Sequence, residues 1–178
     1  MSARRSFLSI GALALAAATA FTPIAAQASP NTVSRTTAAP MISGAQVIAR
    51  AETWHPHTAQ RIPYNQRVTH GGYRTDCSGY ASMALGLAAP GPNTVGLASS
   101  AVSTRISLRS LVTGDLIIDS TGDSDTRHVV IFERWTSAGH SAYWAYEQRG
   151  GYGTDHRVLT YGLSASSQFH PYHPNVLH

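Results

Sequence analysis

The order of the patterns along the chain constrains the fold more than any other feature of the sequence. Apolar residues at helical spacing come first, in two segments that end before Pro56 and before Pro90. Four strand-like runs follow, rich in apolar, β-branched or aromatic residues: 116–118, 128–135, 143–147 and 156–161. This order predicts an α+β domain with its N-terminal helices packed on a central antiparallel sheet.

The two predicted helices have recognisable starts. Ser43 can cap a helix over 43–54, and Asp76 can cap a second helix by accepting a hydrogen bond from a free backbone N–H group. The second helix has a buried face, because four residues recur at helical spacing: Tyr80, Met83, Ala84 and Leu87. The glycine-containing segment 58–75 between the helices is predicted to be a loop.

The N-terminal segment has the pattern of an export signal. Arg4-Arg5 precedes an apolar stretch over 7–20, and Ala26-Gln27-Ala28 has the small residues of a cleavage site. We therefore expect three segments: a signal peptide over 1–28, a linker over 29–40 and a single domain over 41–178. The mature protein is then expected outside the cell, where it can associate with the cell wall.

Charge and composition exclude several classes of function. Loss of Arg4 and Arg5 with the signal peptide lowers the formal net charge from +4 to +2, and no cluster of arginines with interleaved aromatic residues remains. This argues against nucleic-acid binding. No later apolar run is long enough for a membrane span. All 13 basic residues are arginine, a bias typical of GC-rich coding, as in actinobacteria.

Cys77 is the only cysteine, so an exported chain cannot use it for an internal disulfide. It directly follows Asp76 and therefore lies in the first turn of the second predicted helix. The free N–H groups and the dipole of a helix N-terminus favour a thiolate, and the same N–H groups can bind the oxyanion of a tetrahedral intermediate. Cys77 is thus a candidate nucleophile. The alternative is a small buried apolar residue, which is a common role of free cysteines.

His128 begins the most strand-like run and is the candidate general base. A hairpin turn centred on Ser137 and Ala138 predicts that Glu147 lies directly opposite His128, on the same face of the sheet. A carboxylate there would fix the tautomer of the imidazole and stabilise its charged form. A register shifted by one residue would place Gln148 opposite His128 instead, so Gln148 is the competing third residue.

Three motifs, in this order and spacing, resemble the NlpC/P60 superfamily of cell-wall cysteine peptidases. They are Asp76-Cys77-Ser78-Gly79 at a helix start, Gly114-Asp115-Leu116 before a strand, and the strand motif His128-Val129-Val130-Ile131-Phe132. The resemblance covers most of the predicted domain and implies a papain-like fold. It also implies that Cys77 is the nucleophile, that His128 is the base, and that a polar residue on the next strand orients the histidine.

The resemblance extends to the substrate pocket, with two departures. Family members have a site-lining tyrosine in a Pro-Tyr motif, which matches Pro63-Tyr64, and we expect Tyr64, Asp76 and Ser78 to contact substrate. The third catalytic residue of the family is usually His, Asn or Gln, whereas Glu147 is closer to the related amidase-type domains named CHAP. The usual Trp-Gly-Gly before the cysteine motif is reduced to His70-Gly71-Gly72, which predicts a different pocket.

Export and the resemblance together predict a secreted monomeric hydrolase that cleaves amide bonds in peptidoglycan peptides without a cofactor. The sequence leaves open whether the bond lies in the peptide stem or joins sugar to peptide, as for a CHAP-type amidase, and whether acyl transfer occurs. An alternative from another class is a catalytically silent cell-wall-binding module. It would use an exposed aromatic surface drawn from Trp54, Trp135, Trp144 and Tyr152.

A metal site is the remaining alternative, and we expect none. The candidate ligands are His55 with His57, His170 with His173, and a loop with Asp119, Asp123 and Asp125. These spacings match neither the helix of a metalloprotease nor a calcium-binding EF-hand loop.

Overall fold

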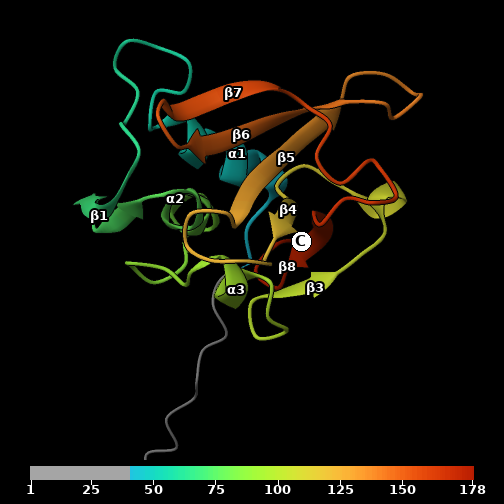
Figure 1. Ribbon diagram of the computed structural model, residues 1–178, viewed down its shortest axis with the longest axis horizontal. Helices are drawn as coiled ribbons and strands as arrows, with labels where there is room; N and C mark the ends of the chain where they lie inside the picture. The colour runs from blue at the N-terminus through green and yellow to red at the C-terminus, as the bar shows by residue number, and fades with distance from the viewer. Residues whose placement is uncertain (1–40) are drawn as a thin grey trace, which may run out of the picture. The chain divides into compact units, whose positions relative to one another are not determined.

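The computed structural model describes residues 41–178, so the predicted signal peptide and linker lie outside the described residues. These residues form an α+β structure in which N-terminal helices pack against a six-stranded antiparallel sheet (Figure 1). The predicted class and the predicted order of helices before the sheet are therefore confirmed. None of the helices in residues 41–178 is both long and apolar enough to cross a membrane.

Both predicted helices are present and begin at the predicted caps. Helix α1 spans Gly44–Glu52, and the Ser43 hydroxyl accepts a hydrogen bond from the Gln46 N–H group while the Gln46 side chain accepts one from the Ser43 N–H group. Helix α2 spans Cys77–Leu85 with Asp76 as its N-cap, and it ends at Gly86, which has the positive φ of 67° typical of a helix C-terminus. A short helix α3 follows at Thr94–Leu97.

The main sheet has the strand order β3-β8-β4-β5-β6-β7, and all its neighbouring strands run antiparallel. Its strands are β3 Ser103–Arg105, β4 Leu116–Asp119, β5 His128–Trp135, β6 Tyr143–Arg149, β7 Gly153–Leu159 and β8 His170–Pro174. The 3-10 helix η1 Leu108–Ser110 precedes β4. In Figure 1, β5, β6 and β7 lie side by side, with α2 beyond the start of β5.

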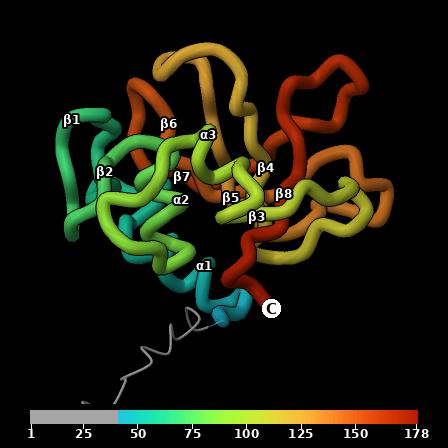
Figure 2. Tube along the Cα trace, turned by 90° about the horizontal axis from the view of Figure 1, so that it is seen from below, coloured from blue at the N-terminus to red at the C-terminus, as the bar shows by residue number. Residues whose placement is uncertain are grey.

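The core fills both faces of the sheet. Helix α2 contacts β5 and β6, and α1 contacts α2. On the helix face the core includes Tyr80, Val129, Ile131 and Tyr146, whereas Val130, Phe132 and Ala145 belong to the opposite face. The C-terminal end returns to α1, where Ile42 bridges to Leu177 (Figure 2). Cys77 belongs to the core on the helix face of the sheet.

Four strands, β1, β2, β3 and β8, lie where the sequence analysis predicts none. The segment predicted as a loop contains a two-stranded hairpin, β1 Asn65–His70 and β2 Tyr73–Thr75, whose residues are mostly exposed and so give no apolar alternation. Strand β8 was not predicted, because Pro171 and Pro174 lack the N–H groups that strands normally donate. It pairs with β3 and β4 nevertheless, partly through the Pro171 carbonyl, which accepts a hydrogen bond from the Ile106 N–H group.

The predicted register of β5 and β6 is wrong. Glu147 lies opposite Val130 rather than His128. The hairpin turn lies further along than expected, with the Thr136 N–H group bonded to the Ala142 carbonyl, and a bulge lies between Phe132 and Arg134. The resulting shift at the start of β5 is two residues. Because side chains alternate with a period of two, Glu147 still shares a face with His128.

Candidate active site

Cys77 is the first residue of α2 and is buried, with 5% of its surface exposed. The Gly79 and Tyr80 N–H groups both donate to Asp76, whereas the first two N–H groups of a helix have no intrahelical acceptor. The Cys77 Sγ atom lies 3.9 Å from the Thr94 hydroxyl of α3. The thiol therefore sits beside backbone donors that can bind a developing oxyanion, as the sequence predicts for a nucleophile.

Gly79 explains how α2 can begin so close to the hairpin before it. A Cβ atom at this position would lie 2.0 Å from the Arg74 carbonyl oxygen. Any larger residue would push the start of the helix, and Cys77 with it, away from β2. The glycine of the Asp76-Cys77-Ser78-Gly79 motif thus has a steric role in placing the thiol.

Asp76 and Ser78 are bonded within the protein. Asp76 accepts hydrogen bonds from the Gly79 N–H group at 2.6 Å, from the Ser78 hydroxyl at 2.9 Å and from Arg74 Nε at 2.9 Å. Arg74 also donates to the carbonyls of Gly91 and Pro92, at 2.8 and 2.9 Å. This network anchors the loop before α3 to the start of α2. Asp76 and Ser78, two of the three predicted substrate-binding residues, thus lie beside Cys77, but their side chains already have partners.

His128 lies at the start of β5, and its Nε2 atom is 2.7 Å from the Glu147 carboxylate. Burial lowers the pKa of the His128 imidazole, but the influence of the neighbouring Cys77 and the hydrogen bond and charge of Glu147 raise it to about 9. Since Nε2 faces Glu147, Nδ1 is the ring nitrogen left for Cys77. The structure thus joins the predicted base to the predicted carboxylate, and Cys77 is near enough to affect the pKa of the same imidazole.

Glu147 is 1% exposed and has a second cationic partner. Arg157 on β7 donates through Nε to the carboxylate oxygen that His128 does not use, and through Nη2 to the Tyr161 hydroxyl at 3.2 Å. Burial raises the pKa of Glu147, but the bonds and charges of His128 and Arg157 more than offset this and lower it. Glu147 is therefore held as a carboxylate. Sequence reasoning missed Arg157, which no motif marks.

Gln148 does not compete for His128, because it points to the other face of β6. Its side chain is fully buried, and its Nε2 atom donates to the carbonyls of Ile62, Pro63 and Thr75 at 3.1 to 3.2 Å. These carbonyls lie just before Tyr64 and just before Asp76. Gln148 thus ties β6 to the two segments that carry the site.

Tyr64 lies near Cys77, and its hydroxyl accepts a hydrogen bond from Gln66 Nε2 at 3.3 Å. Burial, together with the charges of Cys77, Asp76 and Asp125, raises the pKa of the Tyr64 phenol, although the Gln66 bond opposes this. The phenol therefore keeps its proton and remains a donor. Gln66 also donates to the Ser124 carbonyl and to Asp125, which links β1 to the loop before β5.

Two hollows meet at these residues. A cavity of about 60 Å³ adjoins Cys77, and its lining includes Tyr64, Asp76, Ser78, Thr94 and Arg127. A larger groove of about 420 Å³ adjoins His128 and Glu147. Tyr64, Gln66 and Arg127 line both, so they form the boundary between the thiol side and the imidazole side of the site.

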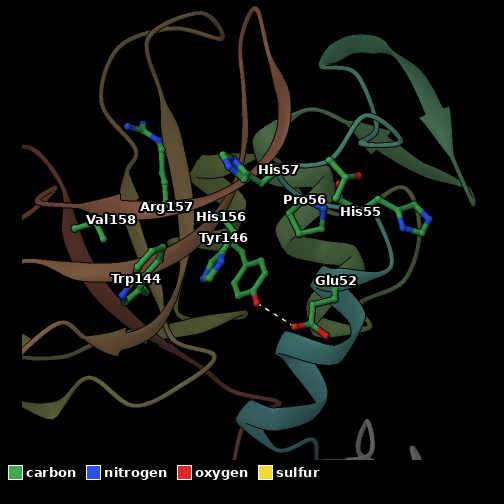
Figure 3. Close-up of a pocket in the computed structure, with 10 residues that line it drawn as sticks. Glu52, His55, Pro56, His57, Trp144, Tyr146, His156, Arg157 and Val158 are labelled. Atoms are coloured by element: carbon green, nitrogen blue, oxygen red, sulfur yellow. Dashed lines mark hydrogen bonds between the residues drawn. The ribbon is translucent and has the colours of Figure 1, made fainter.

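A hollow larger than both lies elsewhere, between the end of α1 and strands β6 and β7. This cleft has a volume of about 740 Å³. Figure 3 shows His55, Pro56 and His57 along one side and Trp144 and His156 along the other, with Tyr146 pointing toward Glu52. The Tyr146 hydroxyl donates to Glu52 at 3.1 Å. The cleft holds no cysteine, because the chain has only Cys77.

The candidate metal ligands are dispersed. His57 bonds Asp155, which also bonds Arg149, and His173 bonds Asp115. Within residues 41–178, no group of three or more His, Cys, Asp or Glu side chains is placed to hold a metal ion.

No protein-family model matches this chain, and no curated protein or solved structure matches it either. The resemblance to the NlpC/P60 superfamily therefore rests on the sequence motifs, to which the geometry of Cys77, His128 and Glu147 is an independent addition.

Proposed function

We propose that the protein is a secreted cysteine hydrolase of the papain-like NlpC/P60 type, which cleaves an amide bond in peptidoglycan peptides. One observation carries the proposal. The His128 Nε2 atom bonds the buried Glu147 carboxylate, and Cys77 and Glu147 together raise the pKa of the imidazole to about 9. An imidazole in this state stabilises a thiolate, which is the attacking form of cysteine.

The reaction then proceeds in two halves. The Cys77 thiolate attacks the carbonyl carbon, and the resulting oxyanion is bound by the N–H groups at the start of α2 and by the Tyr64 hydroxyl. Collapse breaks the C–N bond, and the leaving amine takes the proton from His128. His128 next removes a proton from water, which attacks the thioester. A carboxylic acid leaves, and the Cys77–His128 pair is restored.

The substrate class is supported by two features outside the triad. The predicted signal peptide sends the protein out of the cell, and the three motifs resemble cell-wall peptidases. A monomer without a cofactor would suffice, since Cys77, His128 and Glu147 all come from one chain.

Glu147 also favours a second candidate, a CHAP-type amidase that cuts the link between sugar and peptide. A carboxylate as the third residue is closer to that type, and Glu147 rather than Gln148 bonds His128. Acyl transfer to an amine would use the same thioester. The two candidates share the nucleophile and differ only in the bond that is cut.

The test is incubation of the purified protein with muropeptides of several wall chemistries, followed by mass spectrometry of the fragments. We expect fragments that gain one water at an amide bond, and their masses identify the bond. Cys77→Ala is the control and should give no fragments. If no fragments form, and iodoacetamide alkylates Cys77 no faster than a free thiol, the protein is a silent wall-binding module instead.

A further inference from the structure

Arg127 has a place in the site that no motif marks. It is the last residue of the loop before β5 and lies directly before His128. Its half-buried side chain lines both the cavity at Cys77 and the groove at His128 and Glu147. A substrate bound across the cavity and the groove would therefore lie beside Arg127.

The guanidinium of Arg127 has no ion pair and donates no hydrogen bond within residues 41–178, and its Nε atom is buried. The other arginines near the site are occupied. Arg74 bonds Asp76 and the loop before α3, Arg149 bonds Asp155, and Arg157 bonds Glu147. The Arg127 Nη groups also have no partner within residues 41–178, and unlike Nε they are not buried, so both are open to a ligand that accepts hydrogen bonds.

The neighbouring acids do not take this role. Asp123 uses its carboxylate to accept bonds from the Asp125 N–H group and from Thr126, and the charge of Arg127 makes only a minor contribution to the lowered pKa of Asp123. Asp125 is exposed and bonded to Gln66. The charge of Glu147 is balanced by His128 and Arg157. Arg127 is thus the cation of the groove that is left for a ligand.

We propose that Arg127 determines specificity by binding a carboxylate of the substrate peptide, on the residue that supplies the scissile carbonyl. A guanidinium binds a carboxylate through two parallel hydrogen bonds, which fixes both position and orientation. Arg127 lies at the boundary between the cavity and the groove. A carboxylate bound there would place the scissile carbonyl of the same residue over Cys77. This role rests on the proposed hydrolysis and names its substrate more closely.

The test uses two synthetic muropeptides that differ only at the residue before the scissile amide, which carries a free carboxylate in one and a carboxamide in the other. Wild type should cleave the carboxylate peptide with a kcat/KM at least about tenfold higher. Arg127→Ala should remove this preference by slowing only the carboxylate peptide, and Arg127→Lys should keep part of it. Arg109→Ala, at an exposed arginine of η1, is the matched control and should behave as wild type.

Two results would overturn the assignment: a wild-type enzyme without preference, or an Arg127→Ala variant that slows both peptides equally, which indicates a merely structural role. If wild type cleaves neither peptide, the proposed hydrolysis fails, and binding to the Cys77→Ala variant by calorimetry decides the role of Arg127. Tighter binding of the carboxylate peptide that is lost on Arg127→Ala supports a carboxylate site. Equal binding of both peptides rejects it.

Discussion

The groove at His128 and the cleft of Figure 3 are each lined by a histidine that is bonded to a glutamate, and in both cases the glutamate also binds an arginine. In the groove the set is His128, Glu147 and Arg157. At the cleft it is His156, which lines the cleft, with Glu133 and Arg134 behind it; the histidine and the carboxylate are 2.9 Å apart. The same three residue types therefore occur twice, and their hydrogen bonds alone do not identify a catalytic site.

Burial and neighbours separate the two sets. The Glu147 side chain is fully buried, whereas 17% of the Glu133 side chain is exposed. His128 has a thiol beside it, while His156 stacks on the Tyr146 ring with centroids 4.2 Å apart. The imidazole at the larger hollow is thus stacked on an aromatic ring, whereas the one at the smaller hollow meets Tyr161 and Phe169 only edge-on and has Cys77 as a neighbour. The groove is the better candidate active site because of the residues that line it, although the cleft is larger.

The largest effect should come from removing the nucleophile or its base. We expect Cys77→Ala and His128→Ala to lower turnover of muropeptides by roughly a thousandfold or more, because neither residue has a substitute in the groove. Both should keep their far-ultraviolet circular dichroism spectra. Turnover by Cys77→Ala at the wild-type rate would move the active site away from the groove and reopen the cleft as a candidate.

Glu147→Gln should have the next largest effect, a loss in turnover of roughly ten- to a hundredfold. A negative charge beside an imidazole raises its pKa, so the neutral amide should lower the pKa of His128 from about 9. The wild-type rate should fall as pH rises through about 9, because the imidazolium is lost, and in Glu147→Gln this alkaline limb should move down by about one pH unit.

The matched control for this measurement is Gln148→Ala. Gln148 bonds three backbone carbonyls and faces away from His128, so we expect it to lower the free energy of unfolding by about 1–3 kcal/mol and to leave the pH limbs in place. Unchanged rate and limbs in Glu147→Gln, with activity abolished in Gln148→Ala, would transfer the orienting role to Gln148.

Tyr64→Phe should have a smaller effect, about a tenfold loss in turnover, because one of several oxyanion donors is removed. Its hydroxyl makes one hydrogen bond within the described residues, with Gln66, so the thermal unfolding midpoint should change little. Steady-state kinetics and calorimetry on the same preparation separate the two quantities. A large fall in the midpoint with unchanged turnover would make Tyr64 a packing residue of the loop.

The smallest effect on turnover should come from the cleft. His156→Ala removes a bond to Glu133 and the stacking on Tyr146, which should cost about 1 kcal/mol of stability. Muropeptide turnover should stay within about twofold of wild type, since the cleft contains no thiol. A loss comparable to that of His128→Ala would show that the two regions act together and would break the contrast between them.

The sequence predicted the start of the site better than the sheet that completes it. Capping residues and helical spacing act locally, so Ser43 and Asp76 mark the beginnings of α1 and α2 correctly. Strand pairing depends on where the turn and the bulge lie, and neither position can be predicted from the neighbouring residues alone. The pairing of Glu147 with Val130 was therefore missed, although alternation kept Glu147 on the predicted face.

By itself, the sequence determined that helices precede a sheet, that the lone Cys77 begins a helix, and that His128 begins a strand, because each follows from spacing within a few residues. Only the tertiary structure decided which partners these residues meet. Arg157 reaches Glu147 from β7, Gln148 turns to the opposite face, and Arg127 lies between cavity and groove. Some of these contacts join residues on different strands or loops, and others depend on the register of β5 and β6, which differs by two residues from the prediction. Both are set by how the strands pair in the folded sheet.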